Sequence, residues 1–89
     1  MTTQIEDDIG QTLVNVKSTL SLSLGTTYVI HNLGPSPMIL IEAASTPTDE
    51  RGFSIQAGET WTVEVGADNI YLKSGAANGT CVAAVNDAQ

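Results

Sequence analysis

The sequence predicts an all-β domain: a compact antiparallel β-sandwich or jelly-roll-like barrel of seven or eight short strands with an extended N-terminal arm. Apolar and polar residues alternate strictly over residues 19–24 and again over residues 60–65. Successive side chains of a strand point to opposite faces of a sheet, so this alternation is typical of strands with one buried face. Turns rich in Gly, Pro and Asn separate such segments, at the spacing of about 8–12 residues that is common in sandwiches and barrels.

The N-terminal segment, residues 1–18, is interpreted as an arm that ends in a weak first strand. Residues 1–10 show no regular period and include the acidic run Glu6-Asp7-Asp8. Chain ends of this kind fray unless a partner holds them in place. We therefore expect an arm over this segment, a β domain over residues 19–86 and a short C-terminal tail over residues 87–89.

Turn-forming residues bound each expected strand of the β domain. A break at Gly25 precedes one strand, and a turn that contains Gly34, Pro35 and Pro37 precedes the next. The segment after that turn is a continuous apolar run, which suits a strand that is covered on both faces. The expected strands are residues 12–16 (the weak one), 19–24, 27–32, 38–42, 52–56, 60–65, 69–73 and 80–85.

Alternation divides the apolar residues into two sets. The larger set is expected to face the core: Leu20, Leu22, Leu24, Tyr28, Ile30, Ile39, Ile41, Phe53, Ile55, Trp61, Val63, Val65, Ile70, Leu72, Cys81, Ala83 and Val85. The smaller set points the other way, where a lone sandwich should be polar: Val29, Met38, Leu40, Val82 and Ala84.

The smaller apolar set has two explanations. A covering loop or the N-terminal arm could bury it within the chain. Alternatively it is a contact surface, because contiguous exposed apolar residues mark interfaces. With two apolar residues of the arm, the candidate subunit or partner interface is Ile5, Ile9, Val29, Met38, Leu40 and Val82.

Composition excludes several classes of function. The formal net charge is −7, with only Lys17, Arg51 and Lys73 as cations. Such a chain would repel nucleic acid and anionic membrane surfaces, so neither is an expected partner. We expect no signal peptide and no membrane span, since the sequence has neither a basic segment before an apolar run nor about 20 consecutive apolar residues. One cysteine allows no internal disulfide, and a domain of 89 residues is thin, so oligomerisation is the expected stabilising device.

No residue pattern in the chain indicates catalysis or metal binding. His31 is the single histidine and has no nucleophile motif to support it. The oxygen-bearing side chains of Thr48-Asp49-Glu50 and Asp68-Asn69 lack the spacing of a calcium loop and are more simply explained as turn residues. Cys81 lies in an apolar run, where it should act as a small hydrophobic residue. We therefore expect a protein that is not an enzyme and that has no cofactor and no metal.

Motifs spread over roughly residues 20–85 follow one another in a distinctive order. They are GTTYVIHNLGP (residues 25–35), ILIEA (39–43), GF (52–53), AGETWTV (57–63), IYLKS (70–74) and CVAAV (81–85). This order resembles small structural proteins of tailed bacteriophages, in particular capsid decoration (cement) proteins. The motifs describe the shape of a short β-sandwich and carry no catalytic signature.

The resemblance implies a virion component that is made in the host cytoplasm. Its partners would be the major capsid protein or other virion proteins, and it would be a homo-oligomer, with a trimer favoured because capsids have local threefold axes. Tail or neck placement is an alternative, and so is a receptor- or carbohydrate-binding β module. That module should expose aromatic residues at loop tips, for which Tyr71 is the candidate. A small enzyme would instead need His31 in a pocket with converging polar groups.

Overall fold

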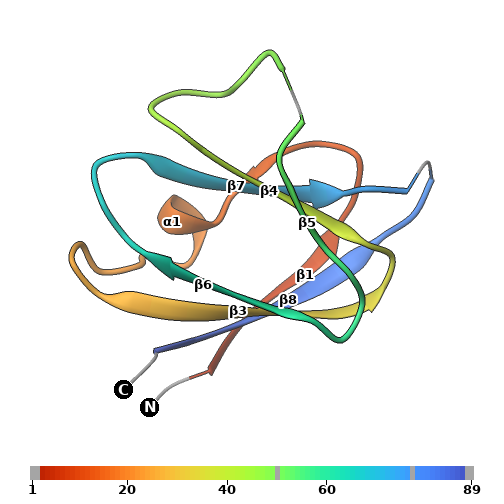
Figure 1. The fold of residues 1–89 in the computed structure, drawn as a ribbon, viewed down its shortest axis with the longest axis horizontal. Coiled ribbons are helices and arrows are strands. Elements are labelled where there is room, and N and C mark those ends of the chain that lie inside the picture. The colour runs from red at the N-terminus through yellow and green to blue at the C-terminus, as the bar shows by residue number, and fades with distance from the viewer. Residues whose placement is uncertain (1–2, 50, 77, 88–89) are drawn as a thin grey trace.

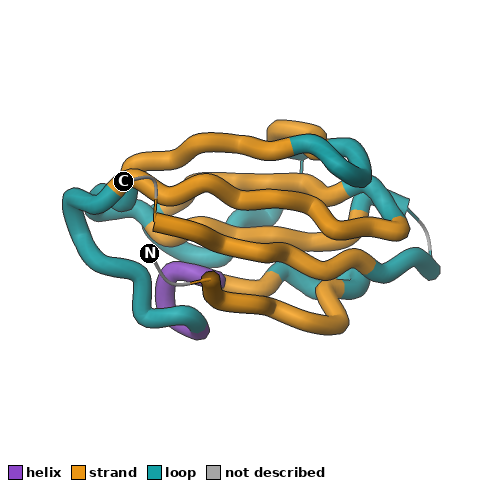
Figure 2. The backbone as a smooth tube through the Cα atoms, turned by 90° about the horizontal axis from the view of Figure 1, so that it is seen from below, coloured by secondary structure: helices purple, strands orange, loops and turns teal. Residues whose placement is uncertain are grey.

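Two four-stranded antiparallel sheets stack face to face as a β-sandwich, which confirms the expected fold class (Figures 1 and 2). The computed structural model describes residues 3–49, 51–76 and 78–87. The first sheet has the order β1 (Thr3–Ile9), β8 (Cys81–Asp87), β3 (Thr27–Pro35) and β6 (Thr60–Glu64). The second has the order β2 (Val14–Asn15), β7 (Asn69–Ser74), β4 (Met38–Ala43) and β5 (Phe53–Ile55). Within the described parts of the chain, no helix is long and apolar enough to cross a bilayer.

One hydrophobic core fills the space between the sheets. Its largest fully buried side chains come from both layers, so neither sheet could fold without the other. Trp61, Leu20 and Val14 pack against this core while remaining partly exposed. The core consists of Ile9, Val16, Leu22, Tyr28, Ile30, Met38, Leu40, Ile55, Val63, Val65, Ile70, Leu72, Cys81, Ala83 and Val85.

The N-terminal arm was a wrong prediction, because residues Thr3–Ile9 form strand β1 of the first sheet. β1 pairs with β8, with Gln4 opposite Val85 and Ile5 opposite Ala84. The Gln4 amide also donates to the carbonyl oxygen of Leu20 at 2.7 Å. A register shift between Glu6 and Ile9 interrupts the ladder, so β1 has no single period for a sequence pattern to show. Of the expected tail, Asp87 ends β8, and residues 88–89 lie outside the described residues.

The strand expected over residues 19–24 is also absent from the structure. The chain instead forms the short helix α1 (Val16–Thr19) and a turn after it. Asn15 caps this helix, since its side-chain oxygen accepts from the backbone N–H of Ser18 at 3.3 Å. Leu22 enters the core, whereas Leu24 is 72% exposed. The alternating Leu and Ser residues of 19–24 thus end a helix and form a turn, because the Asn15 side chain caps α1 and this local hydrogen bond competes with pairing into a sheet.

Strand β4 presents the opposite face to the one expected. Met38 and Leu40 are fully buried, while Ile39 and Ile41 lie on the outer side and are partly exposed. Leu40 is directly opposite Leu72 of β7, which belongs to the core. Both faces of β4 are apolar, so periodicity alone could not tell which one packs inward.

A buried asparagine organises the turn between β3 and β4. Asn32 is fully buried, and its amide nitrogen donates to the carbonyl oxygens of Ser36 at 2.9 Å and Ile55 at 2.8 Å. Its side-chain oxygen accepts from the N–H of Gly34 at 2.8 Å. Gly34 has φ of +82°, a conformation that L side chains rarely adopt. The turn predicted over residues 32–37 is therefore fixed from inside the sandwich.

Candidate functional site

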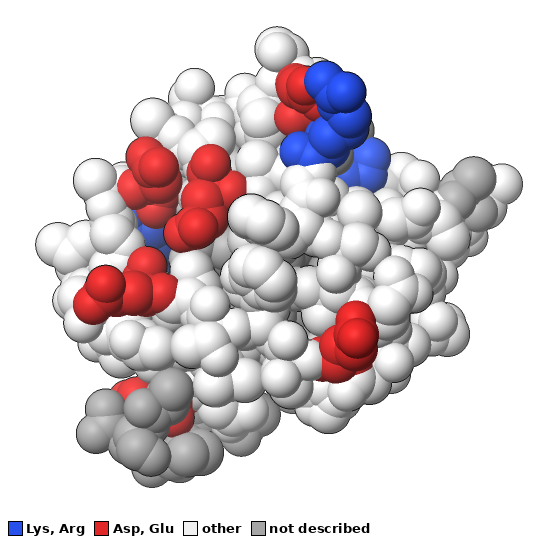
Figure 3. Space-filling model, in the orientation of Figure 1, with Lys and Arg blue, Asp and Glu red and all other residues white. Residues whose placement is uncertain are grey.

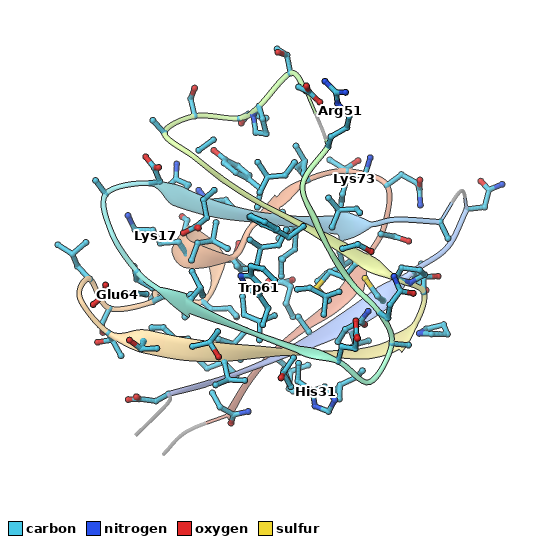
Figure 4. All side chains as sticks on the ribbon, viewed as in Figure 1. Lys17, His31, Arg51, Trp61, Glu64 and Lys73 are labelled. Atoms are coloured by element: carbon cyan, nitrogen blue, oxygen red, sulfur yellow. The ribbon has the colours of Figure 1, made fainter. Side chains whose placement is uncertain are left out.

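The outer face of the first sheet carries exposed apolar side chains from several strands. Alternation along β3 places Val29, His31 and Leu33 on this face. Cross-strand pairing adds Ile5, which is opposite Ala84, and Ala84 is in turn opposite His31. Figure 2 views this sheet nearly face on, and His31 projects from its outer side in Figure 4. The outer face is defined here as Ile5, Val29, His31, Leu33, Thr60, Thr62, Val82 and Ala84.

Two large side chains dominate this outer face. Ile5 is 46% exposed and Leu33 is 51% exposed, while Val29 and Val82 are partly exposed. Among the side chains that the structure describes on these four strands, Lys and Arg do not occur, and Glu64 stands at the end of β6. Contiguous exposed apolar side chains on one sheet face make this surface a candidate for contact with another molecule.

The structure divides the predicted interface into two groups. Ile5, Val29 and Val82 lie together on the outer face, as an interface requires. The prediction of an interface position was wrong for Ile9, Met38 and Leu40, because all three are fully buried in the core of the chain itself. Ile9 turns inward at the β1 register shift, and the other two follow from the inward face of β4.

Leu33 belongs to this surface and was missed by the sequence reasoning. Its signal was present in the sequence, since the alternation of residues 27–32 continues for one more position and puts Leu33 on the side of Val29 and His31. Because the turn-forming residues Gly34 and Pro35 follow it, the sequence prediction placed Leu33 in a loop. Leu33 lies instead at a register shift, where Asn32 is opposite Ala83 and Gly34 is opposite Val82.

A second distinct feature is an aromatic pair at the open side of the sandwich. Phe53 of β5 stacks on Trp61 of β6 with ring centroids 4.6 Å apart and an interplanar angle of 26°. Trp61 lies between the two sheets in Figure 4, and the surface above it is uncharged at its centre in Figure 3. Phe53 is 54% exposed and is not part of the core, so its expected core position was wrong, because its ring packs on Trp61 at the surface.

Two shallow hollows border the aromatic pair. One of about 570 Å³ is lined by Ser54, Ile55, Gly58, Glu59, Thr60 and Trp61. The other, of about 410 Å³, is lined by Leu40, Ile41, Glu42, Arg51, Gly52 and Phe53. The Glu59 carboxylate accepts from the backbone N–H of Gln56 at 2.9 Å and so closes the turn between β5 and β6. Each ring of the aromatic pair thus lines one hollow, Trp61 the first and Phe53 the second.

The other aromatic and nucleophilic candidates do not form a site. Tyr71, expected to be exposed, is 5% exposed, and Asn69 donates to its hydroxyl at 3.3 Å. His31 lies across the ladder from Ala84 and Thr60 on the outer face. Cys81 is fully buried with its sulfur 3.8 Å from the carbonyl oxygen of Ile9, and burial raises the pKa of this thiol. A buried protonated thiol is a packing group and a poor nucleophile.

Asp49, one of the possible oxygen ligands, is used in a local ion pair. Asp49 forms an exposed bidentate pair with Arg51, with a shortest distance of 2.7 Å from Nη2 to Oδ2. Hydrogen bonds from Arg51 hold the pKa of this carboxyl below its usual range. Glu50 lies outside the described residues. The part of the chain that the structure describes contains no cluster of three or more His, Cys, Asp or Glu side chains suited to a metal ion.

Comparison with known proteins finds no matching family, no matching characterised protein and no matching solved structure.

Proposed function

We propose that this chain is a non-enzymatic structural subunit of a tailed-phage virion, a capsid decoration (cement) protein that attaches through the outer face of its first sheet. The observation that carries the proposal is the grouping of Ile5, Val29 and Val82 on one face beside Leu33. These residues come from three strands that are far apart in the sequence. A flat face of this kind suits contact with the broad surface of a protein shell.

Energetics favour attachment through this face. Full burial of one Leu or Ile side chain contributes about 1.5–3 kcal/mol. Ile5 and Leu33 each keep about half of their surface exposed, so a partner that covers both would gain about 1 kcal/mol from each. The few charges on the face keep the desolvation cost of contact low.

The strongly negative charge of the remaining surface supports the same role. Figure 3 shows acidic groups spread over the viewed face, with the larger Lys and Arg patch at one corner and a smaller one among the acidic groups on the left. Arg51 and Lys73 lie at that corner in Figure 4. Like charges discourage nonspecific association among many copies and with packaged nucleic acid. Attachment is then restricted to the weakly charged outer face.

Quantitative mass spectrometry of gradient-purified particles tests this function. In particles of the phage whose genome encodes the chain, we expect the chain at a fixed ratio to the major capsid protein that does not change from one preparation to the next. Particles from which mild denaturation has removed the chain should open at a lower temperature than untreated particles. Particles that lack the chain while the infected cell contains it would overturn the proposal.

A receptor- or carbohydrate-binding β module is the second candidate, and one observation favours it. Phe53 offers an exposed aromatic ring beside two hollows with carboxylates in their rims, Glu59 and Glu42. Aromatic rings with a few polar groups nearby are common features of ligand pockets. Binding in a glycan array that Phe53→Ala abolishes would support this function. Equal signals from both proteins would exclude it.

A further inference from the structure

The four edge strands of the sandwich differ in how well they are protected from pairing with another chain. In the first sheet the edges are β1 and β6, and in the second they are β2 and β5. An edge strand presents unpaired N–H and C=O groups, which natural proteins block by short length, register shifts, charge or proline. Each edge can be tested against these four devices.

Three of the four edges carry such a device. β2 is two residues long and β5 is three residues long, too short to offer a continuous ladder. β1 is longer, but its register shifts between Glu6 and Ile9, and its sequence includes the acidic run at residues 6–8. Pairing of another strand along any of these edges is therefore disfavoured.

Strand β6 has none of these devices along most of its length. Its five residues pair with β3 in unbroken register, from Thr27 opposite Glu64 to His31 opposite Thr60. The sequence of β6 has no proline, lysine or arginine, and its one charge, Glu64, stands at the end. β6 is thus an unprotected edge, at the side of the molecule that faces the viewer in Figure 1.

The backbone groups on the free side of β6 follow from the ladder. The backbone N–H of Val65 donates to the carbonyl oxygen of Thr26, and the backbone N–H of Asn32 donates to the carbonyl oxygen of Glu59, at 3.0 Å each. Hydrogen-bonded and non-hydrogen-bonded pairs alternate along an antiparallel ladder. Since residues 59 and 65 are hydrogen-bonded, Trp61 and Val63 are the residues of β6 that exchange hydrogen bonds with β3. The backbone groups of Thr60, Thr62 and Glu64 consequently point away from the sheet and are available to a new strand.

We propose that a second copy of this chain pairs antiparallel with β6 about a twofold axis at Thr62. The two first sheets then form one continuous sheet of eight strands. In this register Thr62 is opposite Thr62 of the second copy, and Thr60 is opposite Glu64. The outward backbone groups of all three residues are then satisfied by the same groups of the partner.

The antiparallel register makes the β6 edge complementary to itself, which favours a second copy as the occupant. The twofold register never places the two Glu64 carboxylates opposite each other, since each lies across from a Thr60 hydroxyl. The central pair of threonines is a favourable cross-strand combination on a sheet face. The edge therefore fits its own copy without like-charge repulsion between directly opposed residues.

The aromatic pair beside β6 provides a separate argument. Phe53 stacks on Trp61 from the adjacent strand of the other sheet and is 54% exposed. A strand added to β6 would place its inward side chains next to this ring. The partner thus covers the largest exposed aromatic group on this side of the sandwich, which adds apolar burial to the backbone hydrogen bonds. This twofold contact would take the place of the threefold arrangement expected from the phage resemblance.

Molar mass in solution tests the contact independently of any phage particle. The wild-type protein should show twice the 9.3 kDa chain mass in sedimentation equilibrium at micromolar concentrations. Thr62→Pro removes an N–H that faces away from β3, so it should leave the sandwich folded and yield the single-chain mass. Thr62→Lys should also yield the single-chain mass, because it places two lysines opposite each other across the twofold axis. This variant covers the case in which the proline variant fails to fold. Thr62→Val is the matched control and should remain dimeric.

Disulfide trapping then fixes the register. Directly opposed residues have Cα atoms about 5.5 Å apart in a hydrogen-bonded antiparallel pair, within the range that a disulfide bridges. Thr62→Cys should cross-link to itself on mild oxidation, and Thr60→Cys alone should not. A mixture of Thr60→Cys and Glu64→Cys proteins should give mixed dimers. A wild-type protein of single-chain mass, or a dimer that Thr62→Pro and Thr62→Lys leave intact, would overturn the proposal.

Discussion

The side-chain amide of Asn32 donates a 2.8 Å hydrogen bond to the carbonyl oxygen of Ile55 and thereby joins strand β3 of one sheet to strand β5 of the other. Asn32 also bonds to Ser36 and Gly34, so one fully buried side chain holds the β3–β4 turn against the opposite layer. This linkage positions the end of β3, where Leu33 emerges on the outer face. The candidate surface therefore depends on a buried polar residue beneath it.

Asn32→Ala should lower the free energy of unfolding by roughly 2–4 kcal/mol, since two carbonyl oxygens and one N–H lose a buried partner. Asn32→Asp is the matched control for shape. It keeps the acceptor for Gly34 but loses both donors and places a carboxylate against two carbonyl oxygens, so it should be destabilised at least as much. Urea unfolding followed by circular dichroism measures both values. Wild-type stability in the aspartate variant would show that the hydrogen bonds to Ser36 and Ile55 contribute nothing.

Leu40→Ala should destabilise the protein by about 2–5 kcal/mol, because it opens a cavity in the core. Ile41→Ala on the next residue of β4 should cost clearly less, since Ile41 lies on the outer side and is already partly exposed. Denaturant unfolding of the two variants compares the faces directly. A larger loss for Ile41→Ala would mean that β4 is turned the other way.

Deletion of residues 1–10 should strongly destabilise the domain or prevent folding. The deletion removes β1, exposes the edge of β8 and takes fully buried Ile9 out of the core. Thermal unfolding of the truncated and full-length chains provides the measurement. An unchanged unfolding midpoint would instead agree with a dispensable arm.

Cys81 should be almost unreactive toward iodoacetamide at pH 8 in the folded protein and should react rapidly in urea. Burial restricts access and raises the pKa of the thiol from its ordinary value of 9.0, so little thiolate forms. The pKa is raised only in the folded state. The associated stability is therefore fully present below pH 9 and declines as the pH rises above this value. Equal alkylation rates with and without urea would contradict the buried position.

Sequence patterns were sufficient for the fold class and for much of the core, and they failed for identifiable physical reasons. Strict alternation gave the correct face of β6, where the outward residues Thr60, Thr62 and Glu64 are polar, and the expected inward residues Tyr28 and Ile30 of β3 are also buried. It gave the wrong face of β4, since both sides are apolar and only the Leu40–Leu72 pairing decides between them. It also produced a false strand at residues 19–24, where the Asn15 cap and the turn after α1 prevail.

The candidate surface shows the same division. Val29 could be identified from local alternation, because its neighbours Tyr28 and Ile30 are buried. Ile5 was named for the wrong reason, as part of an arm, because the pairing of β1 with β8 joins residues about 80 positions apart. The Phe53–Trp61 stack bridges two different sheets. Pairing across layers is a tertiary event that leaves no local period in the sequence.

The most direct test of the proposed function compares two leucine-to-aspartate variants in assembled particles. Leu33→Asp places a charge in the outer face, and Leu24→Asp makes the same change at a more exposed leucine in the turn before β3. Occupancy is measured by mass spectrometry of gradient-purified particles, after circular dichroism has shown that both variants fold. We predict that Leu33→Asp lowers occupancy at least about tenfold, equivalent to about 1.4 kcal/mol, while Leu24→Asp stays at the wild-type level. Full occupancy by folded Leu33→Asp protein would contradict attachment through this face.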